Sequence, residues 1–185
     1  MRKLISLMHV SLDGFCAGPN GEMNWISLGD AIFADVHGMI ATVGAAVYGR
    51  TTYGMMRGYW PGLLDKEDGD PAQRAHARWV EKIPKYTFSR TLAGSDWNNV
   101  HLHRDASEIA ALKEQEGAPL LIFGSPRLTH AFLALDAIDE FWIYLNPVLL
   151  GRGIRYFDQG VKTPLRRVSL KPFDNGVTRF HYVRT

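Results

Sequence analysis

Segments typical of strands alternate with segments typical of helices along most of this 185-residue chain. The predicted strands are short runs rich in aliphatic and β-branched residues, and they span residues 3–10, 45–48, 86–89, 100–103, 119–123 and 140–146. The predicted helices show helical apolar spacing or clear end signals, and they span residues 30–42, 51–56, 73–82, 106–116 and 127–135. Because helical crossovers join parallel strands, this order predicts an α/β sandwich with a central, mostly parallel sheet and helices on both faces.

The end of the chain has a different pattern. Residues 166–171 and 176–183 alternate between apolar and polar side chains, and the Pro-Phe-Asp-Asn-Gly segment between them is typical of a turn. This pattern predicts a C-terminal antiparallel hairpin at one edge, which makes the sheet mixed. No repeat divides the chain, and 46% hydrophobic residues suffice for a substantial core. We therefore expect a single domain that spans residues 1–185.

Charge and cysteine content argue against several function classes. A net charge of +2 and a pI near 8.7, without a long basic run, do not predict nucleic-acid binding. The one cysteine, Cys16, cannot form an internal disulfide, and no Cys-x-x-Cys pair is present for zinc. No segment reaches the ~18 apolar residues of a membrane helix, and no convincing signal-peptide cleavage site follows the N-terminus. We expect a soluble, cytoplasmic protein.

Three predicted strands end in residue types that can bind phosphate. Residues 49–52 (Gly-Arg-Thr-Thr), 89–90 (Ser-Arg) and 124–127 (Gly-Ser-Pro-Arg) each follow an apolar run. Glycine lets an anion approach the backbone, a following helix N-terminus offers N–H donors, and arginine adds charge. These ends also have structural explanations, such as a helix cap or an exposed turn. Three of them in one chain, without a P-loop or a Gly-x-Gly-x-x-Gly fingerprint, favour an extended polyphosphate ligand.

Metal and hydrolase sites are only weakly indicated. His101 and His103 share one face of a predicted strand, but no third ligand has suitable spacing. The acidic run at residues 65–70 could chelate a metal, although a solvated turn explains it more simply. No Gly-x-Ser-x-Gly elbow is present. The strand ends therefore remain the leading candidates for a site.

Several motifs, in their order along the chain, resemble the dihydrofolate reductase superfamily. These motifs are residues 11–15 (Ser-Leu-Asp-Gly-Phe), 18–25 (Gly-Pro-Asn-Gly-Glu-Met-Asn-Trp), 47–53 (Val-Tyr-Gly-Arg-Thr-Thr-Tyr), 122–125 (Ile-Phe-Gly-Ser) and the segment from 139 to 153. The resemblance is closer to the branch related to the C-terminal reductase domain of the riboflavin-biosynthesis deaminase–reductase. It implies a dihydrofolate-reductase-like three-layer sandwich, NADPH as the cofactor, hydride transfer to a small heterocyclic substrate, and a homodimer.

The resemblance also implies a site, residue by residue. The residues that would hold the cofactor are Gly14, Gly49, Arg50, Thr51, Thr52, Ser89, Arg90, Gly124, Ser125, Pro126, Arg127 and Leu128. The loop at residues 12–25 matches the mobile loop that covers nicotinamide and substrate, and its substrate-loop residues are Leu12, Asp13 and Trp25. One departure is Ser125, since the family often has Gly-Gly at positions 124 and 125.

Two acids are candidates for the catalytic proton donor. In dihydrofolate reductase an acid follows the loop tryptophan, and Asp30 follows Trp25 at a similar separation in sequence. Asp35 instead resembles the acid that riboflavin-pathway reductases have in the corresponding helix. An acid in the first turn of a helix is also favoured by the helix dipole alone. The zinc signature that a deaminase half would need, His-x-Glu with Pro-Cys-x-x-Cys, is absent.

The leading hypothesis is an NADPH-dependent reductase similar to the 5-amino-6-(5-phosphoribosylamino)uracil reductase of riboflavin biosynthesis. A true dihydrofolate reductase is one alternative, and dihydrofolate turnover with antifolate inhibition would indicate it. A nucleotide-binding module without catalysis is the other alternative, and NADPH binding without turnover of any acceptor would indicate that.

Overall fold

One mixed sheet runs through the computed structural model, which describes residues 1–66, 70–157 and 162–185. Among these residues, eight strands lie in the order β5-β4-β3-β6-β1-β7-β10-β9. Their bounds are β1 Leu4–Ser11, β3 Ala45–Gly49, β4 Lys85–Phe88, β5 Val100–His103, β6 Leu120–Phe123, β7 Glu140–Asn146, β9 Leu165–Pro172 and β10 Thr178–Arg184. The strands from β5 to β7 are parallel, whereas β10 is antiparallel to β7 and β9. The predicted sheet and its C-terminal hairpin are confirmed.

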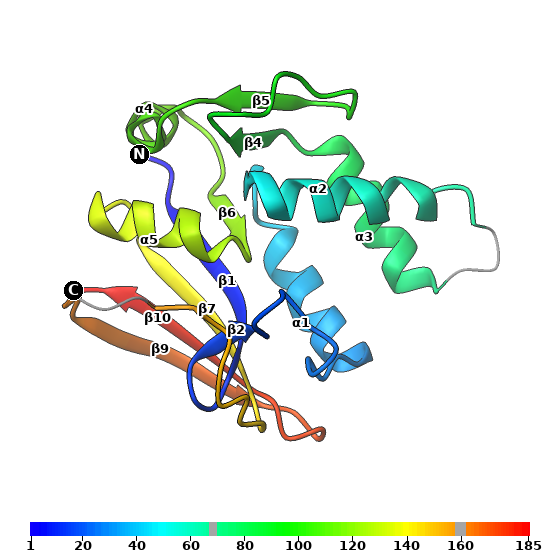
Figure 1. Cartoon of the computed structure of the whole chain (residues 1–185), viewed down its shortest axis with the longest axis vertical. Coiled ribbons are helices and arrows are strands. Elements are labelled where there is room, and N and C mark those ends of the chain that lie inside the picture. The colour runs from blue at the N-terminus through cyan, green and yellow to red at the C-terminus, as the bar shows by residue number, and fades with distance from the viewer. Residues whose placement is uncertain (67–69, 158–161) are drawn as a thin grey trace.

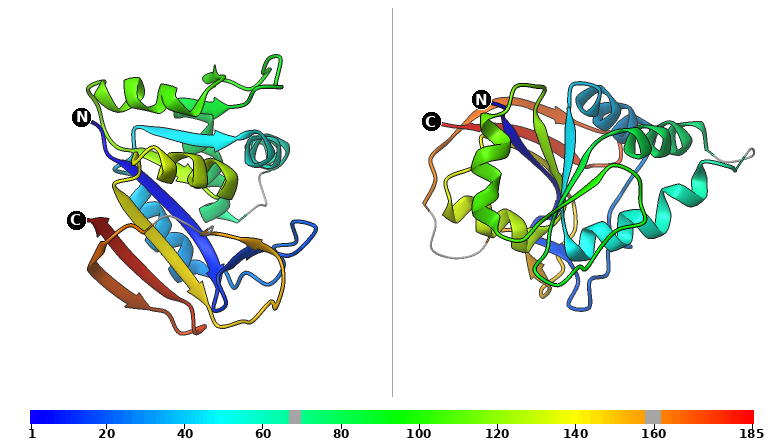
Figure 2. Two further views of the ribbon diagram at one scale, coloured as in Figure 1. Left: turned by 60° about the vertical axis from the view of Figure 1, so that its left-hand side comes forward. Right: turned by 90° about the horizontal axis from the view of Figure 1, so that it is seen from above.

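Helices cover both faces of the sheet (Figure 1), as the sequence predicts. Helices α1 (Asp30–Ile40), α2 (Arg50–Tyr59) and α3 (Pro71–Lys82) contribute to one core, and α4 (Ile109–Glu114) and α5 (Pro126–Ala134) to the other. Figure 2 shows the sheet and the helix layers on its two faces from two further directions. The fold is therefore the α/β sandwich with helices on both faces.

Alternation along the central strand β1 places its side chains in the two cores. Ile5 and Leu7 pack with Ile32 of α1, whereas Leu4 packs on the other face with Phe132 of α5. Successive side chains of a strand point to opposite faces, so an apolar run is needed when both faces are covered. The odd-numbered positions of β1 consequently face the layer that contains α1.

Short elements account for most differences from the sequence-based assignment. Strands β2 (Phe15–Ala17) and β8 (Ile154–Arg155) form a separate two-stranded sheet, although the sequence predicts a loop at residues 12–25. Strands of two or three residues are too short to show the alternation of apolar and polar side chains by which a strand is recognised in a sequence. The helix expected over residues 106–116 begins as a 3₁₀ turn, η2 (Ala106–Glu108), and a second such turn, η1 (Pro61–Leu63), follows α2.

The acidic run at residues 65–70 lies partly outside the described residues, because positions 67–69 are not described. Its last residue, Asp70, accepts a hydrogen bond of 2.8 Å from the backbone N–H of Ala72 and so caps α3. Within the described ranges, no three His, Cys, Asp or Glu side chains form a group suited to a metal ion. None of the described helices has the length and apolar character needed to cross a membrane.

Candidate functional site

The ends of β3 and β6 meet at the carboxyl edge of the sheet. The backbone N–H of Gly49 donates a hydrogen bond of 3.0 Å to Oγ of Ser125. Gly124 and Ser125 both have φ of 55°, in the left-handed region, and this pair turns the chain from β6 into α5. Such a φ is easy for glycine and costly for serine, and strained backbone of this kind is typical of functional sites. The structure thus joins two of the three predicted strand ends.

Two helices begin at this junction without a side-chain cap. Helix α2 starts directly after Gly49, and α5 starts directly after Ser125. By contrast, Asp70 caps α3 and Asp105 caps η2 with its side chain. The first backbone N–H groups of an uncapped helix lack helical partners and carry the positive end of the helix dipole. Two such ends side by side form an arrangement suited to an anion.

Three exposed arginines stand beside these strand ends. Arg50 and Arg127 lie in the first turns of α2 and α5, and Arg90 follows β4. Within the described residues, none of the three guanidinium groups forms an ion pair. Their positive charge therefore remains available to a ligand with several phosphates.

The remaining cofactor candidates shape the backbone more than they extend toward solvent. Ser89 is buried, and its hydroxyl accepts from the N–H groups of Thr91 (3.2 Å) and Leu92 (3.0 Å), which fixes the turn that carries Arg90. Thr52 and Leu128 are also buried, whereas Thr51 is exposed and Pro126 is the first residue of α5. A Cβ at position 49 would lie 3.7 Å from Leu128 and Ser125, which is an ordinary van der Waals distance.

The loop after β1 is anchored by Asp13. Its Oδ1 accepts from the Ser11 hydroxyl at 2.6 Å, and its Oδ2 accepts from the N–H of Gly151 at 2.7 Å. These hydrogen bonds, that of Ser11 first, lower the pKa of Asp13 to about 2. Gly14 follows with a left-handed φ of 88°, and its carbonyl accepts from Tyr156 N–H at 3.1 Å. Asp13 and Gly14 therefore connect this loop to the segment around β8.

The side chains of Leu12 and Trp25, the other two substrate-loop candidates, are partly or largely exposed to solvent. The Leu12 side chain is 62% exposed. Trp25 is half-buried, and its indole N–H donates to the carbonyl of Glu22 over 3.0 Å. Both side chains belong to a loop rather than to the sheet, so they can change position without disturbing the core.

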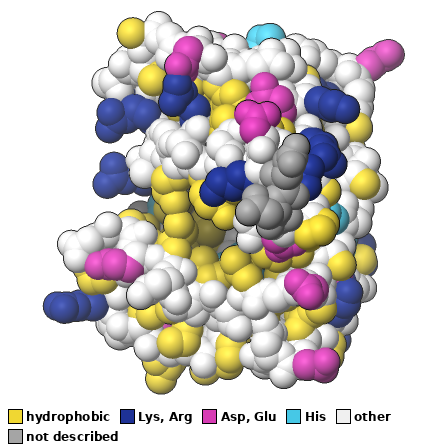
Figure 3. All heavy atoms as spheres, turned by 90° about the vertical axis from the view of Figure 1, so that its right-hand side faces the viewer, with side chains coloured by type: hydrophobic (Ala, Val, Ile, Leu, Met, Phe, Trp, Pro, Cys, Tyr) yellow, Lys and Arg dark blue, Asp and Glu magenta, His cyan; other side chains and the backbone are white. Residues whose placement is uncertain are grey.

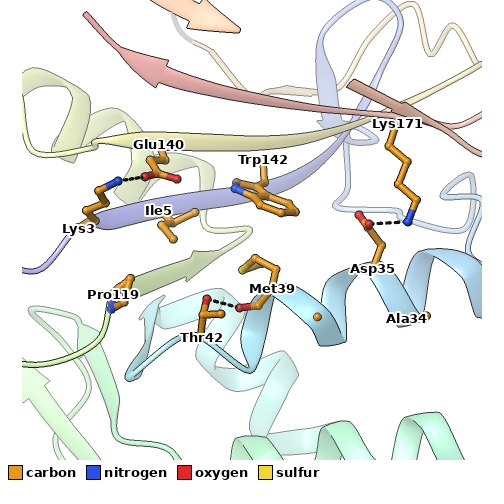
Figure 4. A pocket seen from close by; sticks show the side chains of 11 residues that line it. Lys3, Ile5, Ala34, Asp35, Met39, Thr42, Pro119, Glu140, Trp142 and Lys171 are labelled. Atoms are coloured by element: carbon orange, nitrogen blue, oxygen red, sulfur yellow. Dashed lines mark hydrogen bonds and ion pairs between the residues drawn. The ribbon is translucent and has the colours of Figure 1, made fainter. Parts of the chain in front are cut away.

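The two acid candidates have very different surroundings. Asp30 is exposed in the first turn of α1, where no described residue pairs with it. Asp35 lies deeper in α1, accepts from the Tyr144 hydroxyl at 2.9 Å, and forms ion pairs with Lys171 (2.8 Å) and Arg179 (3.1 Å). Figure 4 shows Asp35 and Lys171 at one end of a cavity of about 580 Å³. That cavity also contains Lys3 and Glu140 from the amino ends of β1 and β7, so it lies away from the Gly49–Ser125 junction.

Three residues that the sequence did not single out lie near the carboxyl ends of β1 and β7. His9, near the carboxyl end of β1, stacks on Tyr144 with ring centroids 4.9 Å apart. Its Nδ1 is 3.3 Å from the amide nitrogen of the buried Asn146. Burial lowers the pKa of His9 to about 4. His9 could have been recognised in the sequence as a polar ring among apolar neighbours at the end of a predicted strand. No sequence pattern marks Tyr144 or Asn146 as site residues.

The surface near α2 and α3 is hollowed. Figure 3 shows this side of the molecule, where hydrophobic side chains line a depression and Lys and Arg side chains border it. An apolar depression with a few polar groups at its rim is the usual form of a small-molecule site.

The chain is similar in sequence to two proteins of Bacillus subtilis (strain 168). YyaP is 29% identical over 184 residues, which cover 98% of this chain and 94% of YyaP. YwjB is 30% identical over 192 residues, which cover 99% of this chain and 98% of YwjB. Both relatives are described only as uncharacterized proteins, so they carry no statement of activity.

Solved structures with low sequence identity share the fold. A Shewanella sp. PV-4 protein, assigned by name to riboflavin biosynthesis, has a TM-score of 0.75 at 21% identity and 99% coverage of both chains. The deaminase/5-amino-6-(5-phosphoribosylamino)uracil reductase of Thermotoga maritima has a TM-score of 0.68 at 17% identity, and the match covers all of this chain but 57% of that one. Dihydrofolate reductase from Enterococcus faecalis, solved with NADP(H), has a TM-score of 0.67 at 14% identity, with 99% and 96% of the two chains covered.

These likenesses show that the architecture is that of dihydrofolate reductase and of riboflavin-pathway reductase domains, which confirms the expected resemblance. The model of the RibD C-terminal domain family matches residues 2–179, which is nearly the whole chain. The protein therefore belongs to the RibD C-terminal domain family.

Proposed function

We propose that this protein is an NADPH-dependent reductase that transfers a hydride to a small heterocyclic substrate, in the manner of 5-amino-6-(5-phosphoribosylamino)uracil reductase. The observation that carries the proposal is the Gly49–Ser125 junction, where two uncapped helix N-termini lie side by side with exposed arginines around them. A dinucleotide with several phosphates matches that combination of N–H donors and positive charge.

The residues at the junction fit such a cofactor. Thr51 and Ser125 would hold the pyrophosphate with backbone N–H groups and hydroxyls, since the two helix starts lack other caps. Gly49 and Gly124, whose N–H groups already donate to Ser125 Oγ and to the Leu7 carbonyl, would let the pyrophosphate approach the backbone. Arg50 and Arg90, together with Arg127, would bind the 2′-phosphate side. When bound, NADPH supplies the hydride, and the protein supplies orientation and electrostatics.

The heterocycle would occupy the hydrophobic depression of Figure 3. Leu12 and Trp25 would close over it and exclude water, because they lie on the loop between β1 and α1 and are not locked into the sheet. Holding two reactants in a fixed orientation is a large source of rate acceleration in such reactions. The proton would come from Asp30, Asp35 or water.

Two further proposals concern assembly and location. We expect a homodimer in the cytoplasm. Strand β9 lies at one edge of the sheet, and Leu165, Val168 and Leu170 on it are exposed. An exposed apolar edge strand is a natural place for a second chain to pair. Light scattering after size-exclusion chromatography measures the mass, and a monomer at micromolar concentration would contradict the dimer.

Turnover of NADPH tests the proposed function. Purified protein would be incubated with NADPH and either 5-amino-6-(5-phosphoribosylamino)uracil-type substrates, dihydrofolate, or other pyrimidines and pterins. Saturable oxidation with the phosphoribosylamino pyrimidine supports the proposal. Dihydrofolate turnover blocked by antifolates would instead identify a dihydrofolate reductase, and NADPH binding without turnover across the panel would identify a non-catalytic module.

A further inference from the structure

His9 lies near the carboxyl end of β1, the strand between β6 and β7 in the sheet. It follows Leu7 by two residues on β1, and the Leu7 carbonyl accepts the N–H of Gly124 at 3.1 Å. The imidazole therefore lies on the α1 side of the sheet, just beyond the point where β6 turns into α5. On its other side, His9 is paired in register with Tyr144 of β7.

The tautomer of His9 follows from the orientation of the Asn146 side chain. Oδ1 of Asn146 accepts from the backbone N–H of Ser27 at 3.0 Å, and Nδ2 donates to the carbonyl of Tyr144 at 2.9 Å. These two contacts fix which end of the amide is nitrogen, because an N–H requires an acceptor and a carbonyl requires a donor. Nδ2 is also the atom 3.3 Å from Nδ1 of His9. Nδ1 must then be the acceptor, and the ring proton is on Nε2.

The surroundings keep the ring neutral and fixed. Burial lowers the pKa of His9 to about 4, so the neutral form dominates near pH 7. The stack on Tyr144 sets the plane of the ring, and the Tyr144 hydroxyl is held by Asp35. Lys171 and Arg179 balance the charge of that carboxylate. Among the described residues, Nε2 of His9 has no hydrogen-bond partner.

Building on the reductase function proposed above, we propose that Nε2–H of His9 donates a hydrogen bond to the substrate atom that gains negative charge during hydride transfer. The substrate class this implies is a heterocycle whose reducible carbon is double-bonded to oxygen or nitrogen. The carbon accepts the hydride, the π electrons of the C=O or C=N bond move to the heteroatom, and a proton from Asp30, Asp35 or water neutralises it. His9 keeps its proton, because a neutral imidazole is too weak an acid to release it. Preorganised donors of this kind are worth roughly 10²–10³ in kcat.

Two substitutions at His9 test the role. His9→Phe keeps the stack on Tyr144 but removes the donor, so we expect a roughly 100-fold or larger loss of kcat with little change in NADPH affinity. His9→Gln retains an N–H donor of similar reach and should recover part of the lost rate. Equal kcat for His9→Phe and the wild-type protein would overturn the inference.

Asn146→Asp provides a test through the tautomer. A carboxylate at this position can only accept, so it would draw the proton to Nδ1 of His9 and leave Nε2 bare. The ¹⁵N chemical shifts of the imidazole should show Nε2 protonated in the wild-type protein and Nδ1 protonated in this variant, together with a fall in kcat. Protonation on Nδ1 in the wild-type protein would overturn the inference.

These readouts separate the inference from the proposed function. The NMR measurement requires neither NADPH nor substrate, so it reports on His9 even if no acceptor is found. Wild-type turnover with an unaffected His9→Phe variant would contradict the role of His9 alone. Absence of NADPH binding and turnover in the wild-type protein would remove the reductase function, and with it this use of the histidine.

Discussion

Gly49 and Ser125 are joined by a hydrogen bond of 3.0 Å from the backbone N–H of the first to the hydroxyl of the second. Gly49 ends β3, and Ser125 follows the neighbouring strand β6. The bond consequently fixes the separation of the two strand ends and of the helices that begin there. Ser125 has a φ of 55°, a backbone conformation that glycine would adopt more easily.

Substitution of Ser125 should separate the contribution of its hydroxyl from the strain of its backbone. Ser125→Ala removes the acceptor and keeps the side chain at positive φ, so we expect a loss of about 1 kcal/mol in unfolding free energy. Ser125→Gly loses the same bond but relieves roughly 1 kcal/mol of strain, so it should be the more stable variant. Urea denaturation measures both. A glycine variant less stable than the alanine variant would show that the strain is small.

The exposed arginines should distinguish NADPH from NADH. If Arg50 and Arg90 bind the 2′-phosphate, alanine at either position removes a charge-assisted contact of about 1.5 kcal/mol or more, which is roughly a tenfold loss in NADPH affinity. NADH lacks that phosphate, so its affinity should change less. Fluorescence titration with both cofactors measures the difference.

Arg166→Ala is the matched control for those variants. Arg166 is also exposed but lies on β9, at the edge of the sheet opposite β4 and β5. Its removal should leave both affinities unchanged. Equal losses for NADPH and NADH in the Arg50 and Arg90 variants would count against the assignment of these residues to the 2′-phosphate.

Paired substitutions of the two acids should show which one acts in catalysis. Asp35→Asn leaves the largely buried Arg179 without its carboxylate, so we expect a loss of about 3 kcal/mol in unfolding free energy. Asp30→Asn alters an exposed residue without a described partner and should change stability by at most about 0.5 kcal/mol. Stability from urea denaturation and kcat from NADPH oxidation would be measured together. A fall in kcat for Asp30→Asn at unchanged stability would assign the proton to Asp30, and unchanged kcat would exclude it.

The sequence was most informative where the strands are buried. Strand β7 has the predicted bounds, because its apolar run from Phe141 to Leu145 is bounded by the polar residues Glu140 and Asn146. The bounds of the edge strand β5 also match the prediction, although its side chains are not buried. Strands β2 and β8 were missed because their pairing depends on a tertiary contact between Phe15 and Arg155 rather than on a local pattern. The fold was thus predictable from local signals, and the small second sheet was not.

The candidate site was predictable only in part. Local motifs pointed to Gly49 and Ser125 separately, but the hydrogen bond between them arises from the parallel pairing of β3 and β6. His9 and Tyr144 are 135 positions apart, and only the register of β1 against β7 brings their rings together. Similarly, the ion-pair partners of Asp35, Lys171 and Arg179, lie on β9 and β10 near the end of the chain. Contacts set by register cannot be read from spacing along one segment.

Stability should rise with pH across the weakly acidic range because of His76 and His9, two histidines whose pKa is lowered in the folded protein. The ring of His76, on α3, stacks on that of His37, and the ring centroids of His76 and Trp60 are 4.2 Å apart. Burial, and to a smaller extent the charge of His37, lowers the pKa of His76 from 6.5 to about 4. Burial has the same effect on His9. Between about pH 4 and 6.5 the unfolded chain binds more protons at these histidines than the folded protein, so unfolding free energy increases with pH across that range, and the histidines add no further change above it. Each histidine contributes up to about 3 kcal/mol to this change.

Urea denaturation at several pH values, with variants of two histidines, checks this slope. His76→Phe should remove about half of it, because phenylalanine packs among the same rings without a proton to bind. His101→Gln is the control, since His101 is exposed on the edge strand β5 and its replacement should leave the slope intact. The depressed pKa of Asp13, about 2, affects stability only below about pH 4, outside this window. A full slope in His76→Phe would mean that the buried imidazole of His76 does not resist protonation, and the slope would then have to come from His9 or other groups.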